Sequence, residues 1–256
     1  YIDTDLADIN LSLPQIFEGA AKERQARAAV KANAEVKNGN TEADPGRRFD
    51  FSAASDAMYF NRTMIQKTTA WRLQISSSPA LENPLLARMT EFWFNHLNVY
   101  IGKGPVRPFV GHYVINVARA HALGKFEDLL LASARHPAML FYLDQWQSVA
   151  AGTRTPQGNA RGLNENYARE LMELHTLGVD GGYTQSDVRE LARVLTGWTV
   201  GPQDSTGFRF AQRFHDNDRK VVLGTSYPEG LFSGGVTEGE HAIRALARHP
   251  STARRI

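Results

Sequence analysis

The densest group of potentially reactive side chains lies between Asn164 and His175. On an α-helix, Asn166, Glu170 and Glu173 follow one another at spacings of four and three residues, so their side chains point the same way. Two carboxylates one turn apart can share a proton, bind a hard cation, or act as acid and base once their surroundings differ. The polar face of an ordinary surface helix has the same pattern, and the spacing alone favours that second interpretation.

Two histidines fall on apolar helix faces. His96 lies beside Trp93 in a helical stripe, so we expect either a hydrogen-bonded structural histidine or a site residue at the base of a cleft. His175 shares the apolar side of its helix with Leu171, which indicates a core or boundary histidine rather than a metal ligand. The same periodicity predicts that Leu174 faces the core.

A third group lies in a predicted turn, where His215, Asp216 and Lys220 are close in sequence. Turns often present functional groups, although a solvated turn has the same composition. A calcium loop is not favoured, because its glycine and its distant glutamate are absent. The sequence also lacks the phosphate loop, the dinucleotide fingerprint, the nucleophile elbow and the common zinc-protease motif.

Helical periodicity dominates the segments that must position these groups. Apolar residues recur three and four positions apart, and glycine or proline ends most of the runs. A capping box is expected at Thr184 and Asp187. The predicted helices cover residues 85–97, 108–123, 125–135, 165–177 and 185–195.

Strand patterns occur only near the end of the chain. The segments 208–211 and 220–223 predict one small β-hairpin near residues 208–223. The expected fold class is therefore mainly α, a multi-helix orthogonal or bundle-like domain with that hairpin. The repeated Ala-Arg-His-Pro at 134–137 and 247–250 places His136 and His249 before a proline, where the negative end of a helix dipole explains a structural histidine.

The N-terminal part has a different composition from the rest. Residues 18–37 favour a helix whose apolar positions are mostly alanine, so we expect a solvated helix or one that docks on a partner. Turn formers and charges at 38–48 predict a linker. We therefore expect an N-terminal helical segment and linker over 1–46 and a main helical domain over 47–256. The residues at both termini also suggest that the chain is part of a longer protein.

Composition excludes several classes of function. The 256 residues include no cysteine, which excludes disulfides, thiolate metal sites and a cysteine nucleophile. The apolar runs are far shorter than the roughly 20 residues that a membrane span needs. A net charge of +2 without a dense basic stripe gives no support for nucleic-acid binding.

Several motifs, in order along the chain, resemble the bacterial domain of unknown function 1800 family. The resemblance covers roughly residues 63–256 and implies a mainly helical, exported bacterial protein, periplasmic or extracellular, but it supplies no reaction. This resemblance favours a functional site on the helix that carries Glu170 and Glu173, whereas the spacing alone favours an ordinary surface helix. The segments that carry it are 91–99, 136–144, 164–174, 183–188, 195–198, 214–220 and 249–253.

The leading hypothesis is an exported hydrolase or lyase that acts on a cell-surface or extracellular polymer such as a glycan. The alternative is a non-catalytic helical module of an envelope or extracellular assembly. The sequence identifies no cofactor. A third hypothesis is a divalent metal held by Glu170, Glu173 and one histidine. The expected partners are a polysaccharide or an envelope protein. The expected catalytic residues are Glu170, Glu173, His215 and Asp216, and the expected substrate-binding residues are Trp93, His96, Asn164, Glu165, Asn166, Arg169, Trp198 and Lys220.

Overall fold

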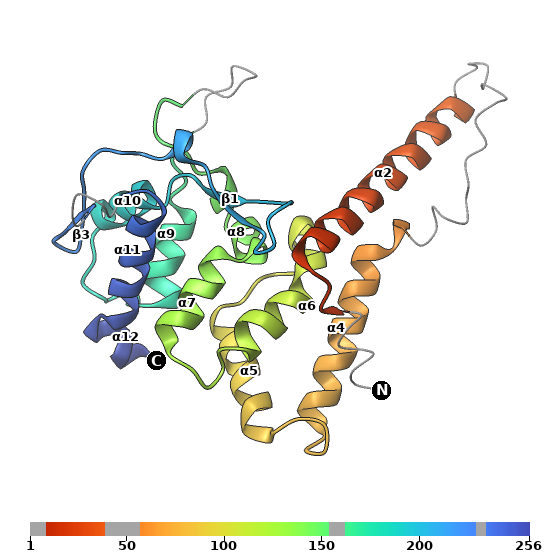
Figure 1. The fold of residues 1–256 in the computed structure, drawn as a ribbon, viewed down its shortest axis with the longest axis horizontal. Coiled ribbons are helices and arrows are strands. Elements are labelled where there is room, and N and C mark those ends of the chain that lie inside the picture. The colour runs from red at the N-terminus through yellow and green to blue at the C-terminus, as the bar shows by residue number, and fades with distance from the viewer. Residues whose placement is uncertain (1–8, 39–56, 154–161, 229–233) are drawn as a thin grey trace.

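The computed structural model describes residues 9–38, 57–153, 162–228 and 234–256 (Figure 1). Helices dominate these residues, as the sequence predicts. In chain order the α-helices are α2 (Leu13–Asn38), α4 (Phe60–Ser77), α5 (Pro84–His96), α6 (Val110–Tyr113), α7 (Phe126–Arg135), α8 (Pro137–Tyr142), α9 (Asn166–Glu170), α10 (Gln185–Val194), α11 (Val236–Arg248) and α12 (Pro250–Arg255).

Shorter helical segments of other types connect them. Three are 3-10 turns, namely η1 (Gly104–Phe109), η3 (Gln145–Gln147) and η5 (Gln212–Phe214). Two are π-helical, namely η2 (Val114–Arg119) and η4 (Leu171–His175), and both directly continue an α-helix. The helix expected over 108–123 is thus a run of three helical forms over 104–119. In the part of the chain that the structure describes, no helix has the length and apolar character for a membrane span.

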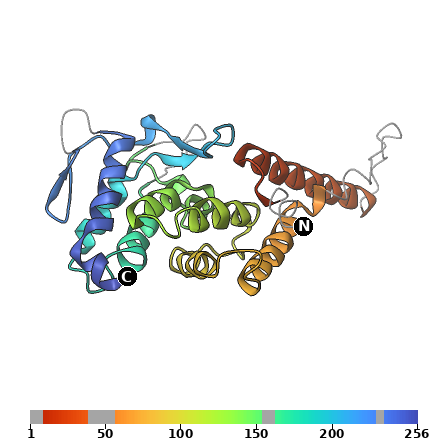
Figure 2. The ribbon, with the colours of Figure 1, turned by 60° about the horizontal axis from the view of Figure 1, so that its bottom comes forward.

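The helices form an elongated assembly around a shared core. Helices α2 and α4 lie at one end, α5 to α8 in the middle, and α9 to α12 with β3 at the other end, while β1 lies beside α8 and reaches toward the start of α2 (Figures 1 and 2). Ile9, Leu13 and Ile16 belong to the same buried cluster as Tyr113 and Leu191. The start of α2 is therefore packed against the body, while the predicted linker and the boundary at residue 46 lie mostly or wholly outside the described residues and stay predictions.

The two predicted strand segments are strands, but they do not pair with each other. Strand β1 (Trp198–Val200) pairs with β2 (Phe208–Phe210), and β3 (Lys220–Val222) pairs with β4 (Thr225–Tyr227), both antiparallel. Leu223 and Gly224 both have positive φ, 48° and 79°, as a two-residue type I′ turn requires. The sequence signal was missed because leucine is unusual at the first of these positions.

His136 and His249 are structural, but for a different reason from the one expected. His136 Nδ1 accepts a hydrogen bond from the backbone N–H of Ala138 (3.1 Å), and His249 Nδ1 accepts one from Ser251 (3.2 Å). Each imidazole therefore caps the start of the helix that follows it. The expected role was a favourable charge at the C-terminal end of the helix before it. An accepting Nδ1 requires a neutral ring, and burial, followed by the neighbouring His112, holds the pKa of His136 well below its usual value.

Helix α11 packs so closely on Trp198 that residue 239 must be glycine. A Cβ atom at Gly239 would lie 2.5 Å from the fully buried indole ring. We expect Gly239→Ala to lower the free energy of unfolding, because an overpacking cost of about 1–3 kcal/mol exceeds the roughly 1 kcal/mol that alanine gains in a helix. Urea unfolding measures this, with Gly104→Ala as the control, since a Cβ there meets no atom within 4 Å. Equal stability of both variants would contradict the close packing.

Candidate functional site

The two glutamates of the polar helix lie where α9 passes into the π-helical turn η4. Glu170 ends α9 and Glu173 lies within η4, and both are half-buried. In a π-helix the hydrogen bonds run from residue i to i+5, so each turn holds about one more residue than in an α-helix. This widening corrects one expectation: Leu174 is turned outward and is 47% exposed, whereas His175 takes its place in the core at 5%.

Side-chain hydrogen bonds account for the wide turn. Thr176 Oγ1 donates to the carbonyl of Leu171 (2.6 Å), five residues earlier. His96 Nε2 donates to the carbonyl of His175 (3.0 Å) and so anchors the turn to α5. Burial lowers the pKa of His96, and burial followed by the charges of His96 and Arg255 lowers that of His175 to about 3. His96 is thus a positioning group for the turn that carries Glu173.

Glu170 and Glu173 form a carboxylate pair without a neutralising partner. Neither side chain makes a hydrogen bond or an ion pair with any residue that the structure describes. Burial first, and then the charge of Glu173, raises the pKa of Glu170, against a smaller opposing effect of Arg169. Burial and Glu173 also raise the pKa of Tyr183 above its ordinary value, which is already well above neutral pH. Tyr183 lies in the motif 183–188 but was not among the predicted site residues.

The residues at the start of the helix hold other parts of the fold. The side-chain amide of Asn164 donates to the carbonyls of Leu143 (3.3 Å) and Asp144 (3.0 Å), and that of Asn166 donates to Leu143 (3.4 Å). Their amides therefore fix the turn after α8, in which Asp144 has a left-handed φ of 58°. They act on the protein's own backbone rather than on a ligand.

Glu165 and Arg169 are also engaged within the protein. Arg169 donates to Glu165 (3.3 Å) and to the side-chain oxygen of Gln185 (2.9 Å), and Gln185 donates back to Glu165 (2.7 Å). These three side chains join α9 to the start of α10. The positive charge of Arg169 is thus shared with Glu165 before it can act on the carboxylate pair.

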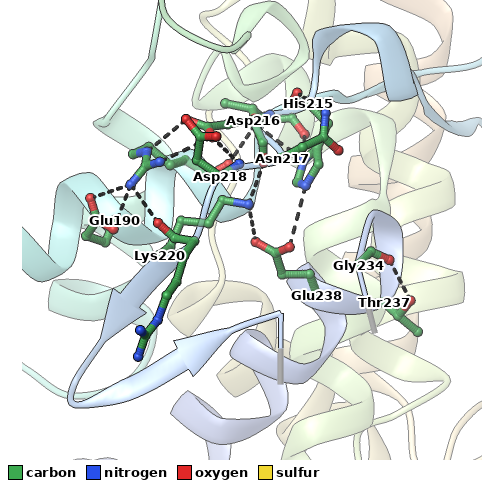
Figure 3. A network of polar contacts seen from close by, with 12 residues as sticks. Glu190, His215, Asp216, Asn217, Asp218, Lys220, Gly234, Thr237 and Glu238 are labelled. Atoms are coloured by element: carbon green, nitrogen blue, oxygen red, sulfur yellow. Dashed lines mark hydrogen bonds and ion pairs between the residues drawn. The ribbon is translucent and has the colours of Figure 1, made fainter. Parts of the chain in front are cut away.

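The predicted turn residues belong to a second group, shown in Figure 3. We call it the buried polar cluster, and its members are Glu190, Arg193, His215, Asp216, Lys220 and Glu238. Lys220 Nζ lies 2.6 Å from Glu238 Oε1, and His215 Nε2 lies 3.6 Å from Glu238 Oε2. Lys220 also donates to the carbonyl of Asp216. The side chains of His215, Lys220 and Glu238 are at most 1% exposed, so this is not the solvated turn that composition alone would allow.

Asp216 is bound by an arginine rather than free for catalysis. Arg193 donates to both of its carboxylate oxygens, at 2.8 and 3.2 Å, and also to Glu190. Burial is the largest effect and acts to raise the pKa of Asp216, but the hydrogen bonds from Arg193 and from the backbone of Asp218, with the charges of Arg193 and Lys220, together lower it. His215 Nδ1 donates to the carbonyl of Thr196 (2.9 Å), which fixes the ring orientation.

The two predicted stacking tryptophans have no free face. Trp198 is fully buried, between Phe208 at 5.0 Å and Gly239 of α11. Trp93 is 9% exposed and its indole N–H donates to the carbonyl of Ala122 (3.0 Å). A sugar cannot stack on a ring that is covered by protein, so both are core residues.

The residues predicted for one site come from different elements. The carboxylate pair lies on α9 and η4, whereas Lys220 lies on β3 and its partner Glu238 on α11. Helix α10 packs against both α9 and β3, and no hydrogen bond or ion pair among the described residues joins the carboxylate pair to the buried polar cluster. No three His, Asp or Glu side chains among these residues are placed to hold a metal ion. Glu238 was missed, although the alternation of β3 turns Lys220 inward and a buried lysine requires a carboxylate.

The Lys220–Glu238 ion pair gives the first prediction from this site. Lys220→Met leaves Glu238 buried without its cation, so we expect a loss of about 3–5 kcal/mol in the free energy of unfolding. The double variant Lys220→Met/Glu238→Leu removes both charges and should be more stable than Lys220→Met. Urea unfolding measures both, and the exposed Lys125→Met is the control. A double variant that loses the sum of the two single losses would contradict a direct pair.

The carboxylate pair gives a prediction about pH. Because the folded-state pKa of Glu170 is raised, its contribution to stability is present below the unfolded value of 4.5 and is lost as pH rises through the folded value. Glu170→Gln removes the cost of the charged form, so the variant should melt higher than the parent at pH 7, by on the order of 1 °C. The difference should vanish below pH 4.5. Glu165→Gln is the matched control: it loses an ion pair, so its melting temperature should fall at pH 7.

Comparison with known proteins identifies the family. No curated protein and no solved structure matches the chain. The family model described as "Protein of unknown function (DUF1800)" matches residues 6–256, which is nearly the whole chain and includes both groups of polar residues. The chain therefore belongs to the DUF1800 family of proteins of unknown function.

Proposed function

We propose that this chain is an exported hydrolase or lyase that acts on an extracellular or cell-surface polymer such as a glycan, with Glu170 and Glu173 as its acid and base. The single observation that carries the proposal is the state of Glu170. Its carboxylate is half-buried, has Glu173 beside it and no cation bound to it among the described residues, and has a raised pKa. A carboxyl group of this kind holds a proton closer to neutral pH, as a general acid must.

The surroundings of the pair fit proton transfer better than metal catalysis. Tyr183 keeps its proton and lies within electrostatic reach of Glu173, so its hydroxyl can donate a hydrogen bond to a substrate beside the pair. Arg255 also acts on Tyr183, and its charge has no carboxylate partner among the described residues, so it can attract a polymer that carries anionic groups. Glycoside hydrolysis needs two carboxyl groups, one that protonates the leaving oxygen and a second that assists the attack on the sugar, and Glu170 and Glu173 supply two. Asp216, the other carboxylate expected to be catalytic, is bound by Arg193 and is not part of this proposal.

Export is the part of the proposal that rests on the family resemblance. The lack of cysteine is compatible with an oxidising compartment but does not require one. Detection of the full-length protein in periplasmic and culture fractions of its host tests this part directly. A purely cytoplasmic distribution would remove the extracellular polymer as substrate while leaving the acid–base chemistry in place.

The alternative is a non-catalytic helical module, and the buried polar cluster favours it. The side chains of Lys220 and Glu238 neutralise each other inside the fold, and Asp216 and Arg193 do the same nearer the surface. Such a network fixes a structure without contacting a ligand. In this hypothesis the carboxylate pair would be an ordinary polar ridge.

Matched glutamate variants separate the two hypotheses. The purified protein is tested on a panel of neutral and acidic polysaccharides, with new reducing ends reporting hydrolysis and the ultraviolet absorbance of unsaturated sugars reporting a lyase. We expect Glu170→Gln and Glu173→Gln to lower kcat by about 10²-fold or more, because each removes a proton-transfer group. Glu165→Gln, on the same helix, should keep most of the activity. Full activity in both pair variants would rule out the carboxylate pair as the catalytic groups.

A further inference from the structure

A cleft of about 610 Å³ opens between α2, η1, the end of α8, η3 and the end of β1. Its volume lies in the range of roughly 300–1,000 Å³ that is usual for ligand pockets. Figure 2 shows the start of α2 beside the β1–β2 hairpin, where Leu13 lies against Gly207. Glu170 and Glu173 do not line the cleft, so it is a second site.

Four aromatic rings form a continuous wall along the cleft. Phe17 and Phe109 have centroids 4.7 Å apart, Phe109 and Phe141 5.7 Å, and Phe141 and Trp146 5.7 Å. The rings come from α2, η1, α8 and η3, so the wall exists only in the folded chain. Phe17, Phe141 and Trp146 are half-buried, and each leaves part of its ring open.

Trp146 differs from the other three tryptophans. Trp71, Trp93 and Trp198 are at most 9% exposed, whereas Trp146 is half-buried in the wall of the cleft. Its indole N–H makes no hydrogen bond to a described residue and can serve a ligand. Its backbone carbonyl accepts a hydrogen bond from Thr199 Oγ1 (3.0 Å), and its ring lies against that of Phe141. These two contacts orient Trp146 along the wall of the cleft.

The charges that line the cleft are unbalanced. Arg24, Arg27 and Arg107 face a single carboxylate, that of Glu23, which leaves a net charge of +2. Glu23 is buried and accepts hydrogen bonds from Arg27 (2.8 Å) and from the backbone N–H of Asn61 (2.7 Å), so it neutralises Arg27 alone. Arg24 and Arg107 have no carboxylate partner among the described residues.

We infer that this cleft binds a small aromatic acid, with its ring against Phe141 and Trp146 and its carboxylate held by Arg24 and Arg107. The guanidinium fork matches a carboxylate in two parallel hydrogen bonds, and aromatic walls favour a flat apolar ring. Ten of the fifteen described lining residues are apolar or glycine, and three of the five polar ones are arginines, a combination that suits an anion with an apolar ring. The site stands independently of the proposed catalysis, since the two share no residue.

Calorimetric titration with 2-naphthoate tests the inference, with the neutral 2-naphthamide as the matched probe. We expect 2-naphthoate to bind one site per chain and 2-naphthamide to bind at least about tenfold more weakly, because it lacks the charge that the arginines hold. The double variant Arg24→Gln/Arg107→Gln and the single variant Trp146→Ala should each weaken 2-naphthoate about tenfold. Arg88→Gln, an exposed arginine on α5, is the control and should bind as the parent does.

Circular dichroism and melting temperature show whether each variant is folded, and Trp146→Phe provides a milder change that keeps a ring and should retain most of the affinity. Equal affinity for the acid and the amide would overturn the role of the arginines. Unchanged binding in Trp146→Ala would overturn the location. Failure of 2-naphthoate to bind would overturn the aromatic acid as the ligand class, and an oligogalacturonate that binds the parent but not Trp146→Ala would show that the cleft takes an acidic glycan instead.

Discussion

The C-terminal part of the molecule depends on one buried ion pair, between Lys220 and Glu238. Two charged groups lose their hydration when they are buried, and only a close partner compensates that cost. Lys220 comes from β3 and Glu238 from the first turns of α11, so the pair fixes one element against the other (Figure 3). The lysine also binds the backbone of Asp216, whose carboxylate is held by Arg193 of α10. These contacts thus fix β3, α10 and α11 relative to one another.

Periodicity explains why most of the fold could be predicted from the sequence. Val188 and Leu191 are completely buried, as the stripe on α10 requires, and Thr184 and Asp187 form the expected capping box. Such features depend on residues that are close in sequence, so local spacing is sufficient to find them. The fold class follows, because the helical runs greatly outnumber the two strand signals.

What could not be predicted depends on contacts between distant residues. The wide turn at Leu171–His175 needs the hydroxyl of Thr176 and a bond from His96, which is 79 positions away from His175. The pairing of the strands could not be predicted for a related reason, since alternation identifies a strand but does not determine which strand it pairs with. The buried position of His215 and Lys220 could not be predicted for the same reason. In the sequence they lie in a polar turn, and the partner that allows their burial, Glu238, is distant along the chain.

The segment from Asn164 to Glu173 connects the two places where this chain offers chemistry. At its start, the amides of Asn164 and Asn166 hold the carbonyls of Leu143 and Asp144, just before Trp146 of the aromatic cleft. At its end, the wide turn presents Glu173 beside Glu170. The six polar side chains of this segment divide into three pairs. Asn164 and Asn166 bind backbone carbonyls, Glu165 and Arg169 bind each other and Gln185, and Glu170 and Glu173 make no bond to a described residue. Packing explains the first two pairs, so the carboxylate pair is the part of the segment that the fold itself does not require.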